Sequence, residues 1–589
     1  MIVQRLLKPD AEINSEYNLF FHSGKGGGYD TNSKVYFANP EAELIFDTYF
    51  NALPLNRYQL PPATPLSIRI KGSGKCIVTV EIARATRSWD ILSKVRLDLD
   101  EADEAVLTIP TPEVTGLIFL SFTAVTDLEI SEIDYRIEHP SIAEPTITGV
   151  ITTFKRDAAV QKTAQRLSAY FKDNTDIADR FQLLVIDNGG DTDSVPFPGG
   201  RVLKNPNYGG AGGFSRGLLT IVTEGLSSHC LFMDDDASFF PEAIRRTLAV
   251  LSFNSSPDLA IAGALITKNR SWMMWENGAI FDGKCHPLDV GKDLRKVQDV
   301  IHAGIAPQIK TPKKYGGWWY FCFPVEHVEK WPFPFFVRGD DVNFALSNSF
   351  DIKTVLGVVS HQEDFFAKQT PLTVYLDMRS HFVHHLTVKN LERSLWKDIK
   401  SFSGFFYRFN ASYHYEAARS VILAIEDLMR GEEFWVSNLD MSRKRQEIAA
   451  YTRREKIAKD IQFNPIDAPL STKKPSKSLF FRTLRKWTLN GHLLPSVFFF
   501  RKGRTIPIGE RNDLTITFLR PFIVRYDYEE CQGYIVKRSN LSFFKNYYIF
   551  FKTIVKYIFN YKKTKSEYLS LHRNLTSMEF WRGKEICSS

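Results

Sequence analysis

The stretch HCLFMDDD at residues 229–236 decides the fold of this 589-residue chain, because an apolar run there ends in three consecutive carboxylates. Two further apolar runs precede it, ITGVITTF at 147–154 and FQLLVID at 181–187, and segments with helical spacing separate the three. Strands that alternate with helices predict a parallel α/β sheet. In such a sheet, ligands bind outside the carboxyl ends of the strands.

Polar side chains follow each of these runs, at the point where the predicted strand ends. They are Arg156 after the first run, Asp187 at the end of the second, and Asp234 to Asp236 at the end of the third. Three adjacent carboxylates repel one another unless a cation is present, and hard divalent ions prefer oxygen ligands. The pattern therefore predicts a Mn²⁺ or Mg²⁺ site at one rim of the sheet. A solvated acidic turn or a helix cap is the alternative interpretation.

A glycine-rich segment, NYGGAGGFSR at residues 207–216, precedes another helical pattern. Glycine lets the backbone approach a ligand closely, and a helix N-terminus favours anions. We predict a loop that closes over a nucleotide sugar. A dinucleotide-binding loop is the alternative, but no acidic residue follows at the spacing that such a loop requires.

Three further sites carry side chains suited to chemistry. Asp340 and Asp341 open a helical pattern, where one carboxylate can cap or orient and the other can act as a general base. His361 ends the run VLGVVSH, and a neutral imidazole suits Mn²⁺, although a lone histidine is more often structural. Trp318 and Trp319 are adjacent, so in a strand at most one of them can face a ligand.

The chain divides into four predicted regions. Short alternating segments separated by turn residues predict a β-sandwich over 1–145, and the α/β pattern covers 146–395. A helical region follows over 396–470; its strongly charged, proline-free pattern runs from 391 to about 460, and a linker is predicted at 465–477. A basic, aromatic, mainly helical region occupies 471–589. Hydrophobic residues make up 44% and charged residues 24%, a composition that excludes disordered and collagen-like classes.

The basic charge is concentrated in the last region. Residues 471–589 hold 23 Lys and Arg against 8 Asp and Glu, a net +15, so the total of +8 leaves −7 for the rest. The segment 542–563 interleaves aromatic and basic residues at helical spacing, which predicts a helix lying on an anionic membrane surface. The alternative is that its aromatic face packs on the body of the protein or on another subunit. No nucleic-acid recognition module supports a nucleic-acid partner.

Cysteine usage and hydropathy bear on the compartment. The six cysteines show no CxxC spacing, so neither a disulfide framework nor a zinc finger is indicated, and a reducing cytoplasm is expected. We see no signal peptide, and no uncharged apolar stretch approaches the roughly 18 residues of a spanning helix. The expected location is therefore the cytoplasm, peripheral on the inner face of the cell membrane.

These motifs together resemble the bacterial galactofuranosyltransferases, inverting family 2 glycosyltransferases typified by the polymerising enzyme of mycobacterial galactan. The resemblance spans about residues 40–400. The motifs that carry it, in order, are FDTYFNA at 46–52, TFKR at 153–156, PNYGGAGGFSR at 206–216, LFMDDD at 231–236, GWW at 317–319, the acidic pair at 340–341 and the histidine at 361.

The resemblance implies a central GT-A domain that transfers galactofuranose from UDP-galactofuranose to a glycan hydroxyl, in synthesis of a bacterial surface polysaccharide such as O-antigen, capsule or galactan. The acceptor is expected to be lipid-linked, and a homo-oligomer is compatible with the pattern. The implied metal ligands are Asp234, Asp236 and His361, with Asp341 as the base beside Asp340. The donor-binding residues are expected to be Thr153, Arg156, Asp187, Asn207, Gly210, Arg216 and Asp235, and the acceptor-binding residues Trp318, Trp319, Tyr375 and Arg379.

Two positions depart from the family pattern. Asp377 stands where the family has a histidine, and Gly339 stands where it has the tryptophan before the acidic pair. Both changes fall where substrates are expected to bind. A rhamnosyl- or other hexosyltransferase of the same fold, a nucleotidyltransferase and a non-catalytic glycan-binding scaffold therefore remain alternative hypotheses.

Overall fold

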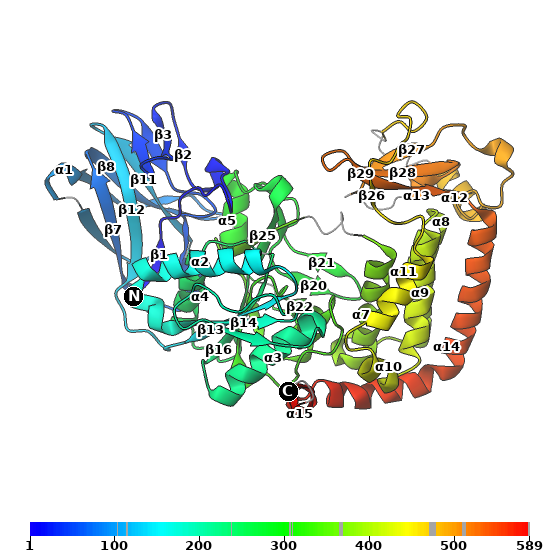
Figure 1. Ribbon diagram of the computed structural model, residues 1–589. Helices are drawn as coiled ribbons and strands as arrows, with labels where there is room; N and C mark the ends of the chain where they lie inside the picture. Colours follow the sequence, from blue (N-terminus) through cyan, green and yellow to red (C-terminus); the bar gives the residue numbers. More distant parts are fainter. Residues whose placement is uncertain are drawn as a thin grey trace.

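The structure is a computed structural model that describes residues 1–589 except 103, 114–115, 237, 306–307, 309, 364–368, 471–478, 509, 511–513 and 587–589. Two antiparallel sheets form the N-terminal part and face each other (Figure 1). One sheet has the order β10-β7-β12-β4-β3 with β1 on β12, and the other β2-β5-β11-β8-β9 with β6 on β11. The strands are β1 Ile2–Arg5, β2 His22–Ser23, β3 Gly27–Asp30, β4 Val35–Ala38, β5 Glu43–Ile45, β6 Leu53–Pro54, β7 Pro65–Ser73, β8 Lys75–Ala83, β9 Asp90–Asp98, β10 Glu104–Pro110, β11 Leu117–Ala124 and β12 Leu128–Ile137, with helix α1 at Leu99–Ala102.

A seven-stranded sheet of order β15-β14-β13-β16-β23-β17-β24 forms the centre of the molecule. Its first four strands are parallel, and β23 runs antiparallel to β16 and β17. The strands are β13 Ile147–Thr153, β14 Phe181–Asp187, β15 Arg201–Lys204, β16 His229–Asp234, β17 Leu259–Ala262, β23 Phe321–Pro324 and β24 Asp351–Lys353. The helices are α2 Asp157–Asp173, α3 Gly209–Glu224, α4 Glu242–Ser252, α5 Val297–Ile305 and α6 Asp340–Ser347.

Two three-stranded sheets extend the central part beside the acidic rim. One joins β18 Ala264–Thr267, β19 Met274–Glu276 and β25 Val359–Gln362, and the other β20 Ala279–Phe281, β21 Cys285–Pro287 and β22 Lys314–Tyr315. The mixed α/β multidomain architecture predicted from the sequence is confirmed.

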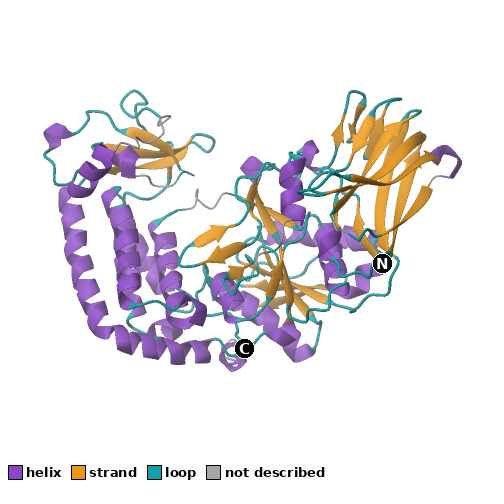
Figure 2. Cartoon of the chain, turned by 180° about the vertical axis from the view of Figure 1, so that it is seen from behind, coloured by secondary structure: helices purple, strands orange, loops and turns teal. Residues whose placement is uncertain are grey.

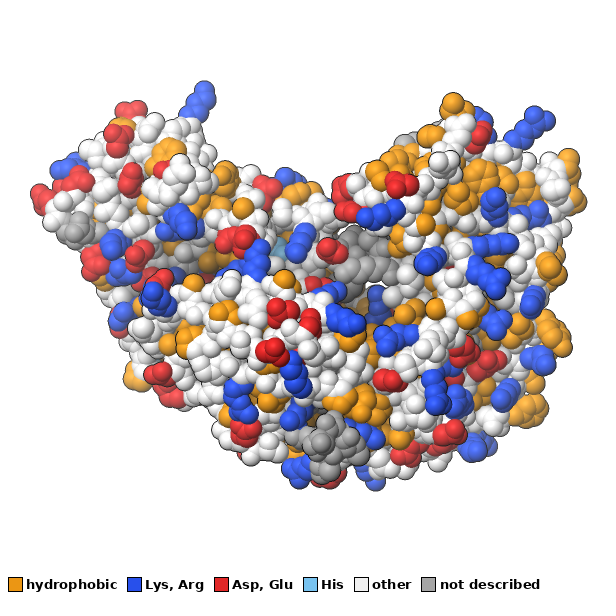
Figure 3. Space-filling view, viewed as in Figure 1, with side chains coloured by type: hydrophobic (Ala, Val, Ile, Leu, Met, Phe, Trp, Pro, Cys, Tyr) orange, Lys and Arg blue, Asp and Glu red, His pale blue; other side chains and the backbone are white. Residues whose placement is uncertain are grey.

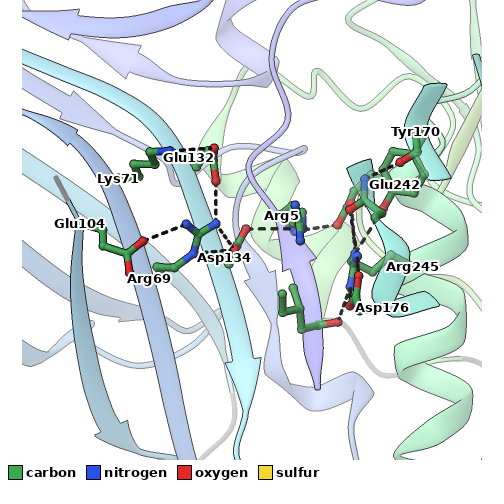
Figure 4. A network of polar contacts seen from close by, with 12 residues as sticks. Arg5, Arg69, Lys71, Glu104, Glu132, Asp134, Tyr170, Asp176, Glu242 and Arg245 are labelled. Carbon is green, nitrogen blue, oxygen red and sulfur yellow. Dashed lines mark hydrogen bonds and ion pairs between the residues drawn. The ribbon is translucent and has the colours of Figure 1, made fainter. Parts of the chain in front are cut away.

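The N-terminal sheets and the central sheet share one buried apolar core, which runs from Val3 to Val359. A polar network crosses the same junction (Figure 4). Glu242 of α4 accepts a hydrogen bond from the backbone N–H of Arg5 at 2.7 Å and another from the Tyr170 hydroxyl at 2.7 Å. Arg245 of α4 pairs with Asp176 at 2.7 Å. Charged side chains that are buried in this way require partners, so these contacts fix how the two parts meet.

Helices dominate the C-terminal part (Figure 2). A second apolar core joins α7 and α9 to the long helix α14, with Phe406 of α8 stacked on Phe550 at 4.1 Å between ring centroids. The helices are α7 Pro371–Thr387, α8 Leu395–Ala411, α9 Tyr415–Leu428, α10 Glu432–Ser437, α11 Ser442–Tyr451, α14 Asn540–Leu575 and α15 Met578–Ile586. None of the helices that the structure describes combines the length and apolarity needed to cross a bilayer.

A four-stranded sheet of order β26-β29-β28-β27 stands where the sequence pattern predicted a mainly helical region. Its elements are β26 Ala458–Lys459, α12 Leu479–Trp487, β27 Arg504–Pro507, α13 Leu514–Thr517, β28 Phe522–Asp527 and β29 Gln532–Lys537. Part of the predicted linker before α12 lies outside the described residues. We call the described residues from β26 to β29 the C-terminal lobe, which lies at the upper right of Figure 1.

The segment 542–563, predicted to lie on a membrane, belongs to α14 and divides its aromatic residues between two faces. Phe543, Phe550 and Ile554 are buried against the body of the protein, whereas Phe551 and Phe559 are exposed. The alternative interpretation, that the aromatic face packs on the body of the protein, therefore holds for one face of α14. The sequence could not decide this, because the same apolar spacing suits a protein core and a lipid surface equally well.

Candidate active site

The acidic rim lies where four parallel strands end together. Thr153 pairs with Asp187 across β13 and β14, and Thr152 pairs with Asp234 across β13 and β16. When these strands are numbered by their order along the chain, β15-β14-β13-β16 reads 3-2-1-4. The strands that follow β13 in the chain therefore lie on both sides of it in the sheet. Such a switch point opens a crevice at the carboxyl ends of the strands, which is where ligands bind in open α/β sheets.

Arg156 bridges two of the three carboxylates after β16. Its Nη1 lies 2.8 Å from an oxygen of Asp235 and 2.9 Å from an oxygen of Asp236. Burial raises the pKa of Asp235, and the charge of Arg156 opposes that shift. The guanidinium is half exposed at the rim, so the same cation could turn to an incoming anionic group.

Asp187 anchors the turn after β14. Its two oxygens accept hydrogen bonds from the backbone N–H groups of Gly189, Gly190 and Thr192 at 2.8 to 3.0 Å, and from Lys204 Nζ at 2.9 Å. Burial opposes ionisation, but these hydrogen bonds outweigh it and lower the pKa of Asp187. The carboxylate therefore shapes the crevice wall and the loop beside it.

The glycine-rich segment is helical from Gly209 onward, as the first turns of α3. Asn207 Oδ1 accepts a hydrogen bond from the backbone N–H of Gly209 at 3.1 Å. A Cβ on Gly213 would lie 2.2 Å from Thr152, and one on Gly210 would lie 3.4 Å from a carboxylate oxygen of Asp340. Glycine is thus needed for α3 to approach β13, and the start of α3 approaches the start of α6. Arg216 is half-buried one turn further along α3.

The carboxylates of Asp234 and Asp341 come from separate elements, and the charge of Asp341 acts on Asp234. Burial raises the pKa of Asp234 to about 7, and the charges of Asp236, Asp235 and Asp341 add to that rise. Burial raises the pKa of Asp341 to about 6. Burial and the neighbouring Asp341 also raise the pKa of Asp340. Titratable groups with strongly shifted pKa values in a crevice mark a candidate catalytic centre.

Glu276 is a functional candidate that the sequence interpretation missed. It ends β19, is 4% exposed, and its Oε1 has no hydrogen-bond partner among the described residues. Burial raises its pKa to about 8, and Asp341 contributes to the rise. The charge of Glu276 in turn contributes to the raised pKa of Tyr315, after burial. The available signal was one acidic residue in the otherwise apolar run MMWE, which sequence patterning alone treats as a strand end.

The two departures from the family pattern lie together beside the acidic pair. Arg338 Nη1 contacts both oxygens of Asp377, at 2.9 and 3.0 Å. Gly339 has a φ of +86°, and a Cβ there would lie 2.5 Å from Ser380 Cβ, so no larger residue fits in this conformation. Gly339 is also the N-cap of α6, and neither aspartate caps the helix; Asp341 instead accepts from the backbone N–H of Val342.

His361 is directed away from the acidic rim in this structure. It neighbours Gln362 in β25, so the two side chains point to opposite faces of the strand. Gln362 Nε2 donates to Asp234 Oδ2 at 3.1 Å, whereas His361 Nε2 lies 3.0 Å from Asn14 Nδ2. The side chain that faces Asp234 is therefore Gln362 and not the predicted ligand His361. Among the described residues, no three His, Cys, Asp or Glu side chains are grouped as a metal centre.

The predicted acceptor-binding residues lie in the apolar cores. Trp318 and Trp319 belong to a turn and not to a strand, and both are buried, Trp318 against Phe214, Phe232 and Phe344. Tyr375 donates its hydroxyl hydrogen to Asp427 at 2.7 Å, and the Arg379 guanidinium lies 4.7 Å from the Trp435 ring centroid. These two side chains of α7 hold the helical bundle together, because the side of α7 that carries them faces α9 and α10.

Two curated proteins match the sequence of this chain over part of its length. Galactofuranosyltransferase GlfT2 of Mycolicibacterium smegmatis is 24% identical over 330 residues, which are 52% of this chain and 51% of that protein. Galactofuranosyltransferase GlfT2 of Mycobacterium tuberculosis is 26% identical over 345 residues, again 52% of this chain and 51% of that protein. Half of this chain is similar to galactofuranosyltransferases. The resemblance predicted from the motifs is therefore confirmed.

The chain spans about half the length of these galactofuranosyltransferases. No family model matches the chain. Among solved structures, GalNAc-T7 with UDP, GalNAc and Mn²⁺ overlaps 46% of this chain and 52% of its own, with 9% identity and a TM-score of 0.30.

Proposed function

We propose that this protein is an inverting, metal-dependent glycosyltransferase of GT-A type that transfers galactofuranose from UDP-galactofuranose to a hydroxyl of a glycan acceptor. The similarity to galactofuranosyltransferases supports the donor and the reaction class. The observation that carries the proposal is the convergence of the start of α6, which carries Asp341, with the start of α3 and the end of β16, close enough that the charge of Asp341 adds to the raised pKa of Asp234. A donor-side carboxylate and a candidate base thereby share one crevice.

Asp341 is the proposed general base. Its raised pKa of about 6 lies near neutral pH, where a carboxylate can accept a proton from a hydroxyl. The O–H bond of the acceptor breaks as its proton passes to Asp341, and the oxygen attacks the anomeric carbon of the donor. The bond from that carbon to the diphosphate breaks, and UDP leaves with the electron pair. Attack opposite the leaving group inverts the anomeric configuration.

A divalent cation suits the carboxylates after β16. The raised pKa of Asp234 reflects burial together with the negative charges of Asp236, Asp235 and Asp341, an environment that a cation relieves. Asp234 and Asp236 would hold Mn²⁺ or Mg²⁺, which when bound supplies positive charge to offset the diphosphate. Gln362 stands beside Asp234 as a neutral side chain, and His361 would have to leave Asn14 before it could contribute.

The remaining rim residues are proposed to bind the donor. Arg156 and the N-terminus of α3 provide positive charge for the diphosphate, and Thr153 with Asp187 and Asn207 shapes the nucleotide side of the crevice. Asp235 orients Arg156. We propose that Glu276 and Tyr315, whose pKa values the charge of Asp341 helps to raise, bind sugar hydroxyls in place of the buried Trp318 and Trp319.

The acceptor is proposed to be a glycan of a bacterial surface polysaccharide, carried on a lipid at the inner face of the cell membrane. The test is incubation of the purified chain with UDP-galactofuranose, Mn²⁺ and a synthetic galactoside, followed by linkage analysis of the product. We expect one or more galactofuranosyl additions and release of UDP. Faster turnover of another nucleotide sugar in a donor panel would replace the donor assignment. Release of pyrophosphate would indicate a nucleotidyltransferase. Absence of metal-dependent turnover with any donor would refute the proposal that the protein is an enzyme of this type.

A further inference from the structure

Six large apolar side chains project from the C-terminal lobe into solvent. They are Phe480, Phe481 and Trp487 of α12 and Val497, Phe498 and Phe500 of the following segment, each between 50% and 82% exposed. We call these six residues the α12 face. Figure 3 shows hydrophobic side chains gathered on this lobe, at its upper right. Monomeric soluble proteins rarely expose so many large apolar side chains within one short stretch of chain, here residues 480–500, so such a stretch marks a binding surface.

The exposure is imposed by the fold around the segment. Phe499, the residue between two exposed neighbours, is half-buried, with the Arg538 guanidinium 3.9 Å from its ring centroid. The backbone N–H of Phe500 donates to the carbonyl of Leu519 at 2.9 Å, and Arg538 also donates to the carbonyl of Leu494 at 2.8 Å. Phe499 thus anchors the segment while Phe498 stays exposed, and the Phe500 ring, also exposed, lies 4.0 Å from the Arg520 guanidinium.

Unpaired positive charge surrounds the α12 face. Arg482 and Lys486 are exposed on α12, and Arg501 and Lys502 are exposed directly after Phe500. Within the described part of the chain, none of these four side chains forms an ion pair. Of the acidic residues of the lobe, Asp527 ends β28 and Glu529 and Glu530 lie on the turn after it, whereas the exposed Asp467 accepts through its backbone carbonyl from the N–H of Gly503 at 2.8 Å. Aromatic residues mixed with basic ones, tryptophan included, are the composition that partitions into the interface of an anionic bilayer.

We propose that the α12 face, with Arg482, Lys486, Arg501 and Lys502 around it, docks this protein onto the surface of an anionic lipid bilayer. The positive charge of this surface favours an anionic bilayer as its partner. A second copy of the chain in a symmetric dimer would bring the same basic patch against itself, which like charges disfavour. The proposal replaces helix α14 as the main contact, since four of the ten Phe and Tyr side chains of that helix are buried in the body. It does not depend on the proposed sugar transfer.

The test is flotation of the full chain with vesicles of phosphatidylglycerol in phosphatidylcholine, compared with phosphatidylcholine alone, at low and high salt. The wild type should float with the anionic vesicles at low salt and be released by high salt. Each Lys or Arg near an anionic surface strengthens binding about fivefold, so the reversal of two charges in Arg482→Glu/Lys486→Glu should weaken partitioning by at least about thirtyfold. Trp487→Ser/Phe498→Ser should lose flotation at either salt concentration.

Matched control variants lie on α14, where Phe559 is 84% exposed and Lys562 and Lys563 are exposed one turn further along. Phe559→Ser and Lys562→Glu/Lys563→Glu should float like the wild type. Unchanged melting temperature and unchanged donor turnover on a soluble acceptor confirm that all variants are folded. The proposal would be overturned if the wild type failed to float or if the control variants lost flotation equally. It would also be overturned by binding to single-stranded nucleic acid in preference to vesicles, or by self-association that the Trp487→Ser/Phe498→Ser change abolishes.

Discussion

Replacement of Glu276 by glutamine should stabilise the protein by an amount that grows with pH. The carboxyl of Glu276 is buried, one of its oxygens has no partner among the described residues, and burial raises its pKa from the ordinary 4.5 to about 8. Below pH 4.5 both the folded and the unfolded chain hold this proton, so the residue does not contribute to pH dependence. Between pH 4.5 and 8 the unfolded chain loses the proton first, and the folded state is progressively disfavoured.

Each pKa unit corresponds to about 1.4 kcal/mol, so Glu276→Gln should gain under about 1 kcal/mol of unfolding free energy at pH 5, about 3 kcal/mol at pH 7 and about 5 kcal/mol above pH 8. Urea unfolding followed by tryptophan fluorescence at pH 5 and pH 8 measures the difference. Glu326→Gln is the matched control, because Glu326 is exposed in the same central part of the chain. An advantage of Glu276→Gln that is equal at both pH values would show that the carboxyl is paired and ionised, and would refute the reasoning.

Three other outcomes test the proposed chemistry. Asp341→Asn should slow transfer about 10²–10⁴-fold with little change in donor affinity measured by calorimetry, and a larger loss in Asp340→Asn than in Asp341→Asn would reassign the base. Because burial raises the pKa of Asp341 to about 6, the acidic limb of the kcat/KM profile should fall below about pH 6, and a limb near pH 4 would contradict this. Asp236→Ala should abolish transfer, EDTA should inactivate the wild type and Mn²⁺ should restore it; full activity in EDTA would exclude the metal assignment.

The sequence by itself placed Asp187 and Asp234 at one rim, because parallel strands place their carboxyl ends at the same edge whatever the details of packing. It also marked Gly339 as a departure from the family pattern. The reason for that glycine needed the tertiary structure, since only the approach of Ser380 on α7 shows that no side chain fits there.

Only the tertiary structure decided which neighbour in β25 faces the rim. A shift of one residue turns a strand side chain to the other face, and the pairing of β25 with β18 directs Gln362, and not His361, at Asp234. The same holds for α14, whose apolar spacing cannot distinguish a lipid surface from a protein core. Glu276 could not be identified from the sequence for a related reason. Its pKa is raised by burial and by the charge of Asp341, which lies 65 positions further along the chain. The residues next to Glu276 in the sequence indicate neither effect.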